Sequence, residues 1–262
     1  MNRIILALIG TGFTFFATVL GSAMVFLFKN KISPKTEKAF LGFAAGIMIA
    51  ASIWSLLIPA QQMAAEQGQN ELLCTCAGFI LGGAFLFLLD KLLPHMHLNS
   101  GEKEGIKSSF AKSTLLVLAV TLHNIPEGMA VGLSFGLSGE SKSLTFSAAA
   151  ALALGIGLQN FPEGAAISLP LKKEGVSSLK AFILGSLSGI VEPVGGVLAV
   201  LLAGTAVAAM PWLLSFAAGA MIFVVVEELI PEARLGEHSD AGTLAVMAGF
   251  ALMMVLDMAF GS

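Results

Sequence analysis

Charged residues are scarce in this chain of 262 residues, where they make up only 12% of the total. Soluble domains usually carry about 25% charged residues. By contrast, 56% of this chain is hydrophobic and its mean hydropathy is +0.88. A soluble fold of this length cannot hide so much apolar surface, so the composition excludes an ordinary soluble protein. The net charge of −3 gives no support to nucleic-acid binding.

Cysteine is also rare, since only Cys74 and Cys76 occur, one residue apart. Two thiols at this spacing build neither a disulfide framework nor the thiolate cage of a copper(I) or storage site. A C-x-C pair can bind a soft metal, but our interpretation is that these are small residues near a helix start. No small-residue cleavage site follows the first apolar stretch, which is therefore predicted to be retained as a helix.

Long apolar runs are abundant, and about 20 apolar residues suffice for a helix to span a bilayer. Short polar segments connect the runs, which predicts an all-α integral membrane protein with eight spans and one domain over residues 1–262. The expected spans lie near 4–28, 39–62, 72–93, 113–136, 145–170, 179–203, 212–231 and 241–260.

Positive charge alternates between successive connections. Cytoplasmic loops of membrane proteins carry an excess of lysine and arginine. Of the 14 lysines and arginines in this chain, only Arg3 and Lys142 lie outside the odd-numbered connections. This bias predicts that the odd connections are cytoplasmic and that both termini are extracellular or periplasmic.

Two distant segments of the sequence resemble each other. Residues 43–60 read FAAGIMIAASIWSLLIPA and residues 216–233 read FAAGAMIFVVVEELIPEA. The spans that follow them end in LLD at Asp90 and VLD at Asp257. Spans 1–3 and 6–8 therefore read as copies. The charge-based topology runs them in opposite directions, as in the inverted repeats of many secondary transporters.

Polar residues gather in the middle of the fourth and fifth spans. Residues 123–128 read HNIPEG and residues 159–164 read QNFPEG. A charged side chain in mid-bilayer costs at least about 2.5–3.5 kcal/mol, so these residues require a partner. A divalent cation is one sufficient partner, and an internal hydrogen-bond network is the alternative.

The spacing within the two motifs predicts two neighbouring metal positions. Residues four apart share a helix face, which pairs His123 with Glu127 and Gln159 with Glu163 at one point. Residues three apart serve an adjacent point, which pairs Asn124 with Glu127 and Asn160 with Glu163. The two glutamates can bridge both points, so the site is predicted to be binuclear.

Two further residues extend this ligand set. Glu192, before Pro193 in the sixth span, is a third carboxylate at similar depth, and Met48 in the second span offers a thioether. Most mid-helix methionines simply pack, which is the alternative for Met48. Imidazole, carboxylate and amide ligands suit zinc, iron, manganese, cobalt or cadmium. His123 argues against calcium and magnesium, which prefer all-oxygen sites.

Two other functions remain open beside metal transport. In an intramembrane zinc-dependent hydrolase, His123 and Glu127 would hold a catalytic zinc, although no H-E-x-x-H motif occurs. In a proton-coupled carrier of a small organic solute, Glu127, Glu163 and Glu192 would relay protons. Our prediction is a transporter and not an enzyme.

These motifs resemble those of the ZIP family, the Zrt/Irt-like zinc and iron transporters, in one of its bacterial branches. HNIPEG, QNFPEG, Glu192 and EELIPE at residues 227–232 carry the resemblance, which extends over nearly the whole chain. It implies transport of divalent metal ions, zinc above all, toward the cytoplasm. It also implies eight helices in a 3+2+3 inverted arrangement, a homodimer, and a place in the cell (inner) membrane.

The resemblance also implies roles for individual residues. The first metal position would consist of Met48, His123, Glu127, Gln159 and Glu163, and the second of Asn124, Glu127, Asn160, Glu163 and Glu192. Some members have aspartate where this chain has Asn160, so its second position has one negative charge fewer. Auxiliary stations for the metal would be Asp90, His95, His97 and Glu228 on the cytoplasmic side and Asp257 in the outer half.

Overall fold

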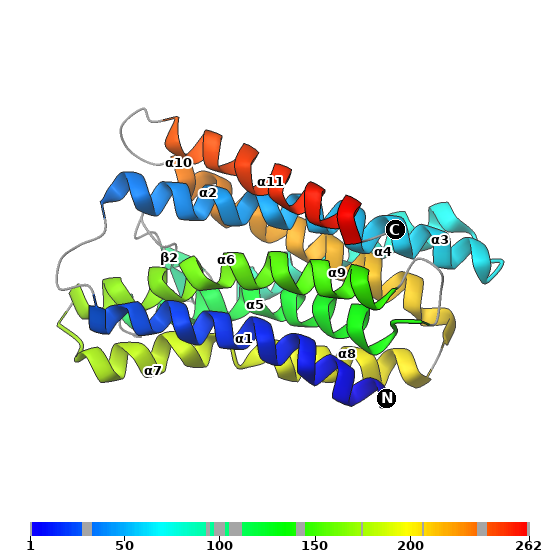
Figure 1. The fold of residues 1–262 in the computed structure, drawn as a ribbon, viewed down its shortest axis with the longest axis horizontal. Helices are drawn as coiled ribbons and strands as arrows, with labels where there is room; N and C mark the ends of the chain where they lie inside the picture. Colours follow the sequence, from blue (N-terminus) through cyan, green and yellow to red (C-terminus); the bar gives the residue numbers. More distant parts are fainter. Residues whose placement is uncertain are drawn as a thin grey trace.

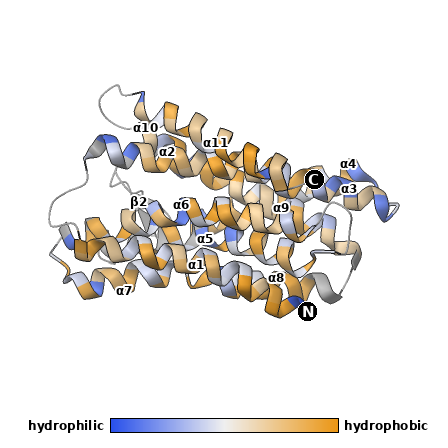
Figure 2. Ribbon diagram, in the orientation of Figure 1, coloured by the Kyte–Doolittle hydropathy of each residue, from blue (hydrophilic) through white to orange (hydrophobic). Residues whose placement is uncertain are grey.

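The computed structural model describes residues 2–27, 33–92, 95–96, 103–104, 112–139, 145–173, 175–205, 207–234 and 240–260. Long helices run along one common axis, and the two ends of the chain lie at the same end of the bundle (Figure 1). Hydrophobic residues cover most of the helices, whereas hydrophilic residues gather at helix ends, such as the turn between α3 and α4 (Figure 2).

The first half of the chain contains α1 (Arg3–Leu27), α2 (Pro34–Ala51), η1 (Ser52–Leu57), α3 (Ile58–Glu66), α4 (Glu71–Leu92), β1 (His95–Met96), β2 (Lys103–Glu104) and α5 (Lys112–Gly136). The second half contains α6 (Phe146–Lys173), α7 (Ser178–Ser188), α8 (Val191–Thr205), η2 (Val207–Ala209), α9 (Met210–Val224), η3 (Val225–Leu229), α10 (Ile230–Arg234) and α11 (Ala241–Phe260). The only strands in the described ranges are the two-residue β1 and β2, which pair antiparallel.

Among the described residues, six helical segments are long and apolar enough to cross a membrane. They are Arg3–Leu27, Lys38–Glu66, Glu71–Leu92, Ser178–Leu202, Met210–Leu229 and Ala241–Phe260. Helices α5 and α6 are not among these six but are also long, with 25 and 28 residues. The fold is therefore that of an all-helical, multi-pass membrane protein.

The helices pack in pairs of close backbone approach. The most extensive contacts join α1 to α6, α5 to α8, α2 to α11 and α4 to α9. Glycine makes this approach possible, because it leaves room where a side chain would meet the facing backbone. A Cβ on Gly82 of α4 would overlap the carbonyl of Phe216 on α9, and one on Gly249 of α11 would overlap that of Phe43 on α2.

The glycine contacts divide the helices into two groups. One group contains α1, α5, α6, α7 and α8, in which Gly164, for example, faces the backbone at Thr18. The other contains α2, α4, α9 and α11. Across the boundary, Gly155 of α6 meets only the side chains of Met253 and Ile47. At this glycine the two groups meet through apolar side chains, whereas the closest glycine contacts within each group meet facing backbone.

Two segments widen into π-helices at matching places. The η1 turn immediately precedes Ile58 and Pro59, and the η3 turn immediately precedes Ile230 and Pro231. Proline lacks an N–H group and its ring clashes with the carbonyl four residues earlier. A wider turn ahead of the proline accommodates both effects without ending the helix.

The sixth expected span is interrupted and not merely kinked. Residues 179–203 are predicted to form one span, but α7 ends at Ser188 and α8 begins at Val191. Because Pro193 has no N–H group to donate to the carbonyl of Gly189, the helix is interrupted just before the proline. The Glu192 N–H donates to that carbonyl instead, at 3.0 Å. Glu192 consequently lies in the first turn of α8.

Candidate metal-binding site

Helices α5 and α6 bring the polar motifs together inside the first helix group. Glu127 is fully buried and Glu163 is only 7% exposed. Glu127 and Glu163 lie close enough to each other and to Glu192 for the three carboxylates to repel one another. Such a cluster away from water demands positive charge or hydrogen-bond donors.

The amide side chains supply some of these donors. Gln159 Nε2 donates to Glu127 Oε1 at 2.6 Å, which ties α6 to α5. Asn124 Nδ2 donates to the carbonyl of Ser188 at 3.0 Å, which ties α5 to the end of α7. A carboxylate or carbonyl oxygen can only accept here, so each amide turns its nitrogen toward the protein and leaves its oxygen facing elsewhere.

Glu192 has a different environment, because donors reach both of its oxygens. Asn160 Nδ2 donates to Glu192 Oε2 at 3.0 Å and also to the carbonyl of Thr14 at 3.3 Å. Thr18 Oγ1 donates to Glu192 Oε1 at 3.3 Å and shares its hydrogen with the carbonyl of Thr14 at 3.4 Å. Helix α1 thereby becomes part of the site, since Thr14 and Thr18 are both fully buried.

Five buried oxygen atoms of the two motifs have no hydrogen-bond partner among the described residues. They are Asn124 Oδ1, Glu127 Oε2, Gln159 Oε1, Asn160 Oδ1 and Glu163 Oε2. Leaving a buried acceptor without a partner costs about 1–3 kcal/mol, and more for a charged one. Oxygens in this condition on two adjacent helices form a set of acceptors suited to a cation.

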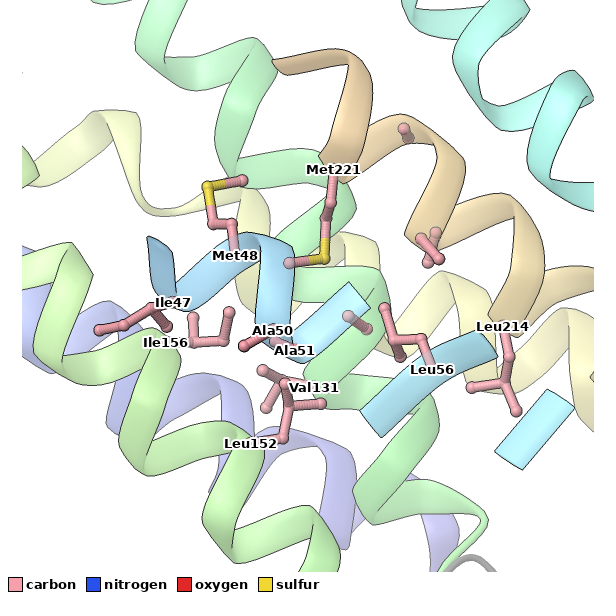
Figure 3. Packing of buried hydrophobic residues seen from close by; sticks show 14 of the residues in the cluster. Ile47, Met48, Ala50, Ala51, Leu56, Val131, Leu152, Ile156, Leu214 and Met221 are labelled. Carbon is pink, nitrogen blue, oxygen red and sulfur yellow. The ribbon is translucent and has the colours of Figure 1, made fainter. Parts of the chain in front are cut away.

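Two other expected ligands, His123 and Met48, are not among these oxygens. The side chain of His123 lies outside the described part of the structure. Met48 is fully buried in the apolar cluster around α2, where Figure 3 shows it with Met221 of α9. Within the described residues, no three His, Cys, Asp or Glu side chains form a metal site on their own. The candidate site formed by the described residues thus combines amide oxygens with carboxylate oxygens.

A cavity of about 190 Å³ lies away from the motifs, and we call it the outer cavity because it is near the end of the bundle where both chain termini lie. Asp257 is the acidic residue in its lining and is 8% exposed. Ser55 Oγ donates to Asp257 Oδ1 at 2.7 Å, whereas Oδ2 has no partner among the described residues. Ser134 also lines the cavity, and its hydroxyl likewise has no described partner.

Four apolar residues, Ala51, Val131, Leu152 and Ile156, lie between this cavity and the motifs along the helix axis and are here called the apolar layer. All four residues are fully buried and belong to one cluster (Figure 3). Along α5 the chain passes from Ser134 at the cavity, through Val131 in the layer, to Glu127 in the site, a rise of about 10 Å. The same order holds along α6, from Ala149 at the cavity through Ile156 in the layer to Gln159 in the site.

The remaining auxiliary residues lie outside the site. Asp90, near the end of α4, is 7% exposed, and Glu228 in η3 is 3% exposed. His95 is placed only by the backbone of β1, and His97 lies outside the described residues. The cysteines do not act as a pair, because Cys74 is buried with its thiol 3.0 Å from Gln69 Oε1 while Cys76 is exposed.

The sequence-based reasoning overlooked α1 altogether. Thr11, Thr14, Thr18 and Ser22 recur every three or four residues and are all fully buried. Hydroxyl residues at this spacing mark one helix face, and such a face in an otherwise apolar helix was the signal available. It identifies Thr14 and Thr18 as partners of Asn160 and Glu192.

Comparison with known proteins gives a consistent picture. Residues 95–257 match the family model described as ZIP Zinc transporter. The chain is 36% identical to "Zinc transporter ZIP11" of Bos taurus, with 97% of each protein covered. It is 39% identical to "Zinc transporter GufA" of Myxococcus xanthus, over 94% of this chain and 95% of that protein. It is 38% identical to "Zinc transporter ZIPB" of Bordetella bronchiseptica, over 97% of this chain and 81% of that protein.

Proposed function

Because the chain belongs to the ZIP zinc transporter family, we propose that it carries divalent metal ions, principally zinc, across a membrane toward the cytoplasm. A member of this family is a transporter and not an enzyme, which removes the alternative of an intramembrane hydrolase. Iron, manganese, cobalt and cadmium are further candidate substrates, since they share the ligand preferences of zinc.

The five unpartnered oxygens are the observation that carries this proposal. Metal transport requires ligands that are buried yet free to bind, and these oxygens meet both conditions. We assign Met48, His123, Glu127, Gln159 and Glu163 to the first metal position. We assign Asn124, Glu127, Asn160, Glu163 and Glu192 to a second, weaker position.

The helix contacts support an inverted 3+2+3 arrangement of eight spans in one domain over residues 1–262. Helix α4 packs on α9 as α11 packs on α2, and α1 packs on α6 as α8 packs on α5. Gly82 and Gly249 each lie eight residues before an aspartate, Asp90 or Asp257, and each meets the backbone of the phenylalanine that opens an FAAG segment. Both chain termini lie at one end of the bundle, which agrees with the charge-based topology that places both on the external side of the membrane.

Auxiliary stations would flank the central site. The outer cavity with Asp257 offers a carboxylate on the uptake side. On the cytoplasmic side we assign this role to Asp90, His95, His97 and Glu228. We further propose a homodimer in the cell (inner) membrane. These assignments carry over from the family resemblance.

Zinc uptake into proteoliposomes is the direct test. Zinc loaded outside vesicles that contain the purified protein is expected to accumulate inside. Cadmium in tenfold excess should suppress the uptake strongly, whereas calcium or magnesium should need about 100-fold higher concentration, because an imidazole ligand favours borderline metals. Competition in which calcium equals zinc would refute the assignment of the site. Solute flux without any metal would favour the proton-coupled carrier.

The outer cavity gives a separate prediction. Asp257→Asn keeps an acceptor for the hydroxyl of Ser55 but removes the charge, so the Michaelis constant for zinc should rise several-fold while the maximal rate changes little. Initial rates of zinc uptake over a range of concentrations provide the measurement. Asp240→Asn, at an exposed position before α11, is the matched control. An unchanged Michaelis constant in Asp257→Asn would exclude the cavity from the pathway.

A further inference from the structure

Glu192 differs from the other carboxylates of the site in that the protein already satisfies it. Thr18 reaches one oxygen and Asn160 reaches the other, and the side chain is fully buried. Glu127 and Glu163, by contrast, each keep an oxygen without a partner among the described residues. An ion that arrives at the site therefore finds ready ligands on α5 and α6 but an occupied carboxylate on α8.

Thr18 is placed for this contact by the close packing of α1 against α6 and α8. Gly164 of α6 faces the backbone of Thr18, so the two helices approach closely at this level. A Cβ on Gly189 would lie 3.1 Å from both Glu192 Oε1 and the Thr18 side chain. A side chain at position 189 would therefore crowd both Thr18 and the carboxylate of Glu192.

Resting on the proposed function, we propose that Thr18 determines how tightly the second position holds a divalent ion. Its hydroxyl competes with the ion for Glu192 Oε1, in the way that Asn160 competes for Oε2. Hydrogen bonds to a charged group are stronger than neutral ones, so while they persist they draw electron density from Glu192 and weaken it as a ligand for the second ion. Thr18 is a positioning residue that keeps this position weak and its ion easily released.

The substitution Thr18→Val tests the proposal, because it keeps the shape of the side chain and removes the hydroxyl. A carboxylate that loses a donor becomes a stronger ligand for a cation. We expect the affinity for the second zinc to rise about tenfold, or a second zinc per chain to appear where the unmodified protein holds one. The first affinity should stay the same. In uptake assays both the Michaelis constant and the maximal rate should fall, since the ion leaves more slowly.

Two variants on the same helix serve as controls in zinc titrations of the purified full-length chain. Thr18→Ser keeps the hydroxyl and should reproduce the unmodified second affinity. Thr11→Val removes an equally buried hydroxyl, but one that donates to the carbonyl of Ala7 in its own helix. It should leave zinc binding unchanged. A general disturbance of packing does not tighten a metal site, so the sign of the change is diagnostic.

Unchanged or weaker binding of the second zinc in Thr18→Val would overturn the proposal, as would equal tightening in Thr11→Val. Failure of the proposed function has another signature. In that case the unmodified protein would neither bind zinc nor accumulate it in vesicles. If the unmodified protein transports zinc and Thr18→Val behaves like it at the second site, only the role of Thr18 is refuted.

Discussion

Replacing Glu163 by alanine is expected to abolish zinc transport, with a loss of at least about 100-fold in flux. Even the outer partners of metal ligands are worth about 10–100-fold, and Glu163 is assigned as a ligand that both positions share. The substitution removes a negative charge from a buried region, where the attraction between a carboxylate and a dication is large. The neutral amides of Gln159 and Asn160 cannot replace that charge.

The matched control is Glu66→Ala, which removes the same side chain from an exposed position at the end of α3. It should transport zinc as the unmodified protein does. Both variants are reconstituted at equal protein density, and thermal unfolding in detergent confirms that each is folded. Normal zinc flux through folded Glu163→Ala protein would refute the assignment of the site.

The second large effect is expected from Gly82→Ala, which places a methyl group against the backbone carbonyl of Phe216. Overpacking a well-packed interior costs about 1–3 kcal/mol, and backbone yields less readily than a side chain. Helices α4 and α9 must therefore separate, and the protein should unfold at a markedly lower temperature or fail to purify as a single species.

Gly83→Ala is the control for this substitution, one residue along the same helix. A Cβ at Gly83 would lie 3.7 Å from the carbonyl of Gly219, which is ordinary contact. Alanine also favours a helix by about 1 kcal/mol over glycine in soluble proteins, so Gly83→Ala should be neutral or stabilising. Equal melting temperatures for Gly82→Ala and Gly83→Ala would show that the α4–α9 contact tolerates a side chain.

The sequence predicted the structure well where a residue type has a single physical reason for its position. Glutamates and asparagines in mid-span had to be buried together, and HNIPEG and QNFPEG led directly to the facing amides and carboxylates of α5 and α6. Apolar runs likewise predicted an all-helical membrane protein. The matching FAAG segments were recognised as a repeat, and the structure shows that their glycines, Gly46 and Gly219, both meet facing backbone.

Features that depend on contacts between distant segments were not predictable in this way. The hydrogen bond from Thr18 to Glu192 joins residues 174 positions apart, and neither local sequence predicts it. The π-helices before Pro59 and Pro231 accommodate a proline within a continuous helix. The sequence was equally compatible with a kinked or an interrupted helix at these prolines. Before Pro193 the helix is interrupted, and Gly189 and Ile190 form a turn there.

The apolar layer bears on how the membrane stays electrically tight. Ala51, Val131, Leu152 and Ile156 offer no polar atom to replace the water around an ion, so a bare or hydrated cation faces a steep dehydration barrier there. In this conformation a membrane potential drives no steady current between the outer cavity and the central carboxylates. Passage of zinc then requires that the layer part or that the site move past it. A cell can thus keep many copies of this protein in its membrane without dissipating its ion gradients.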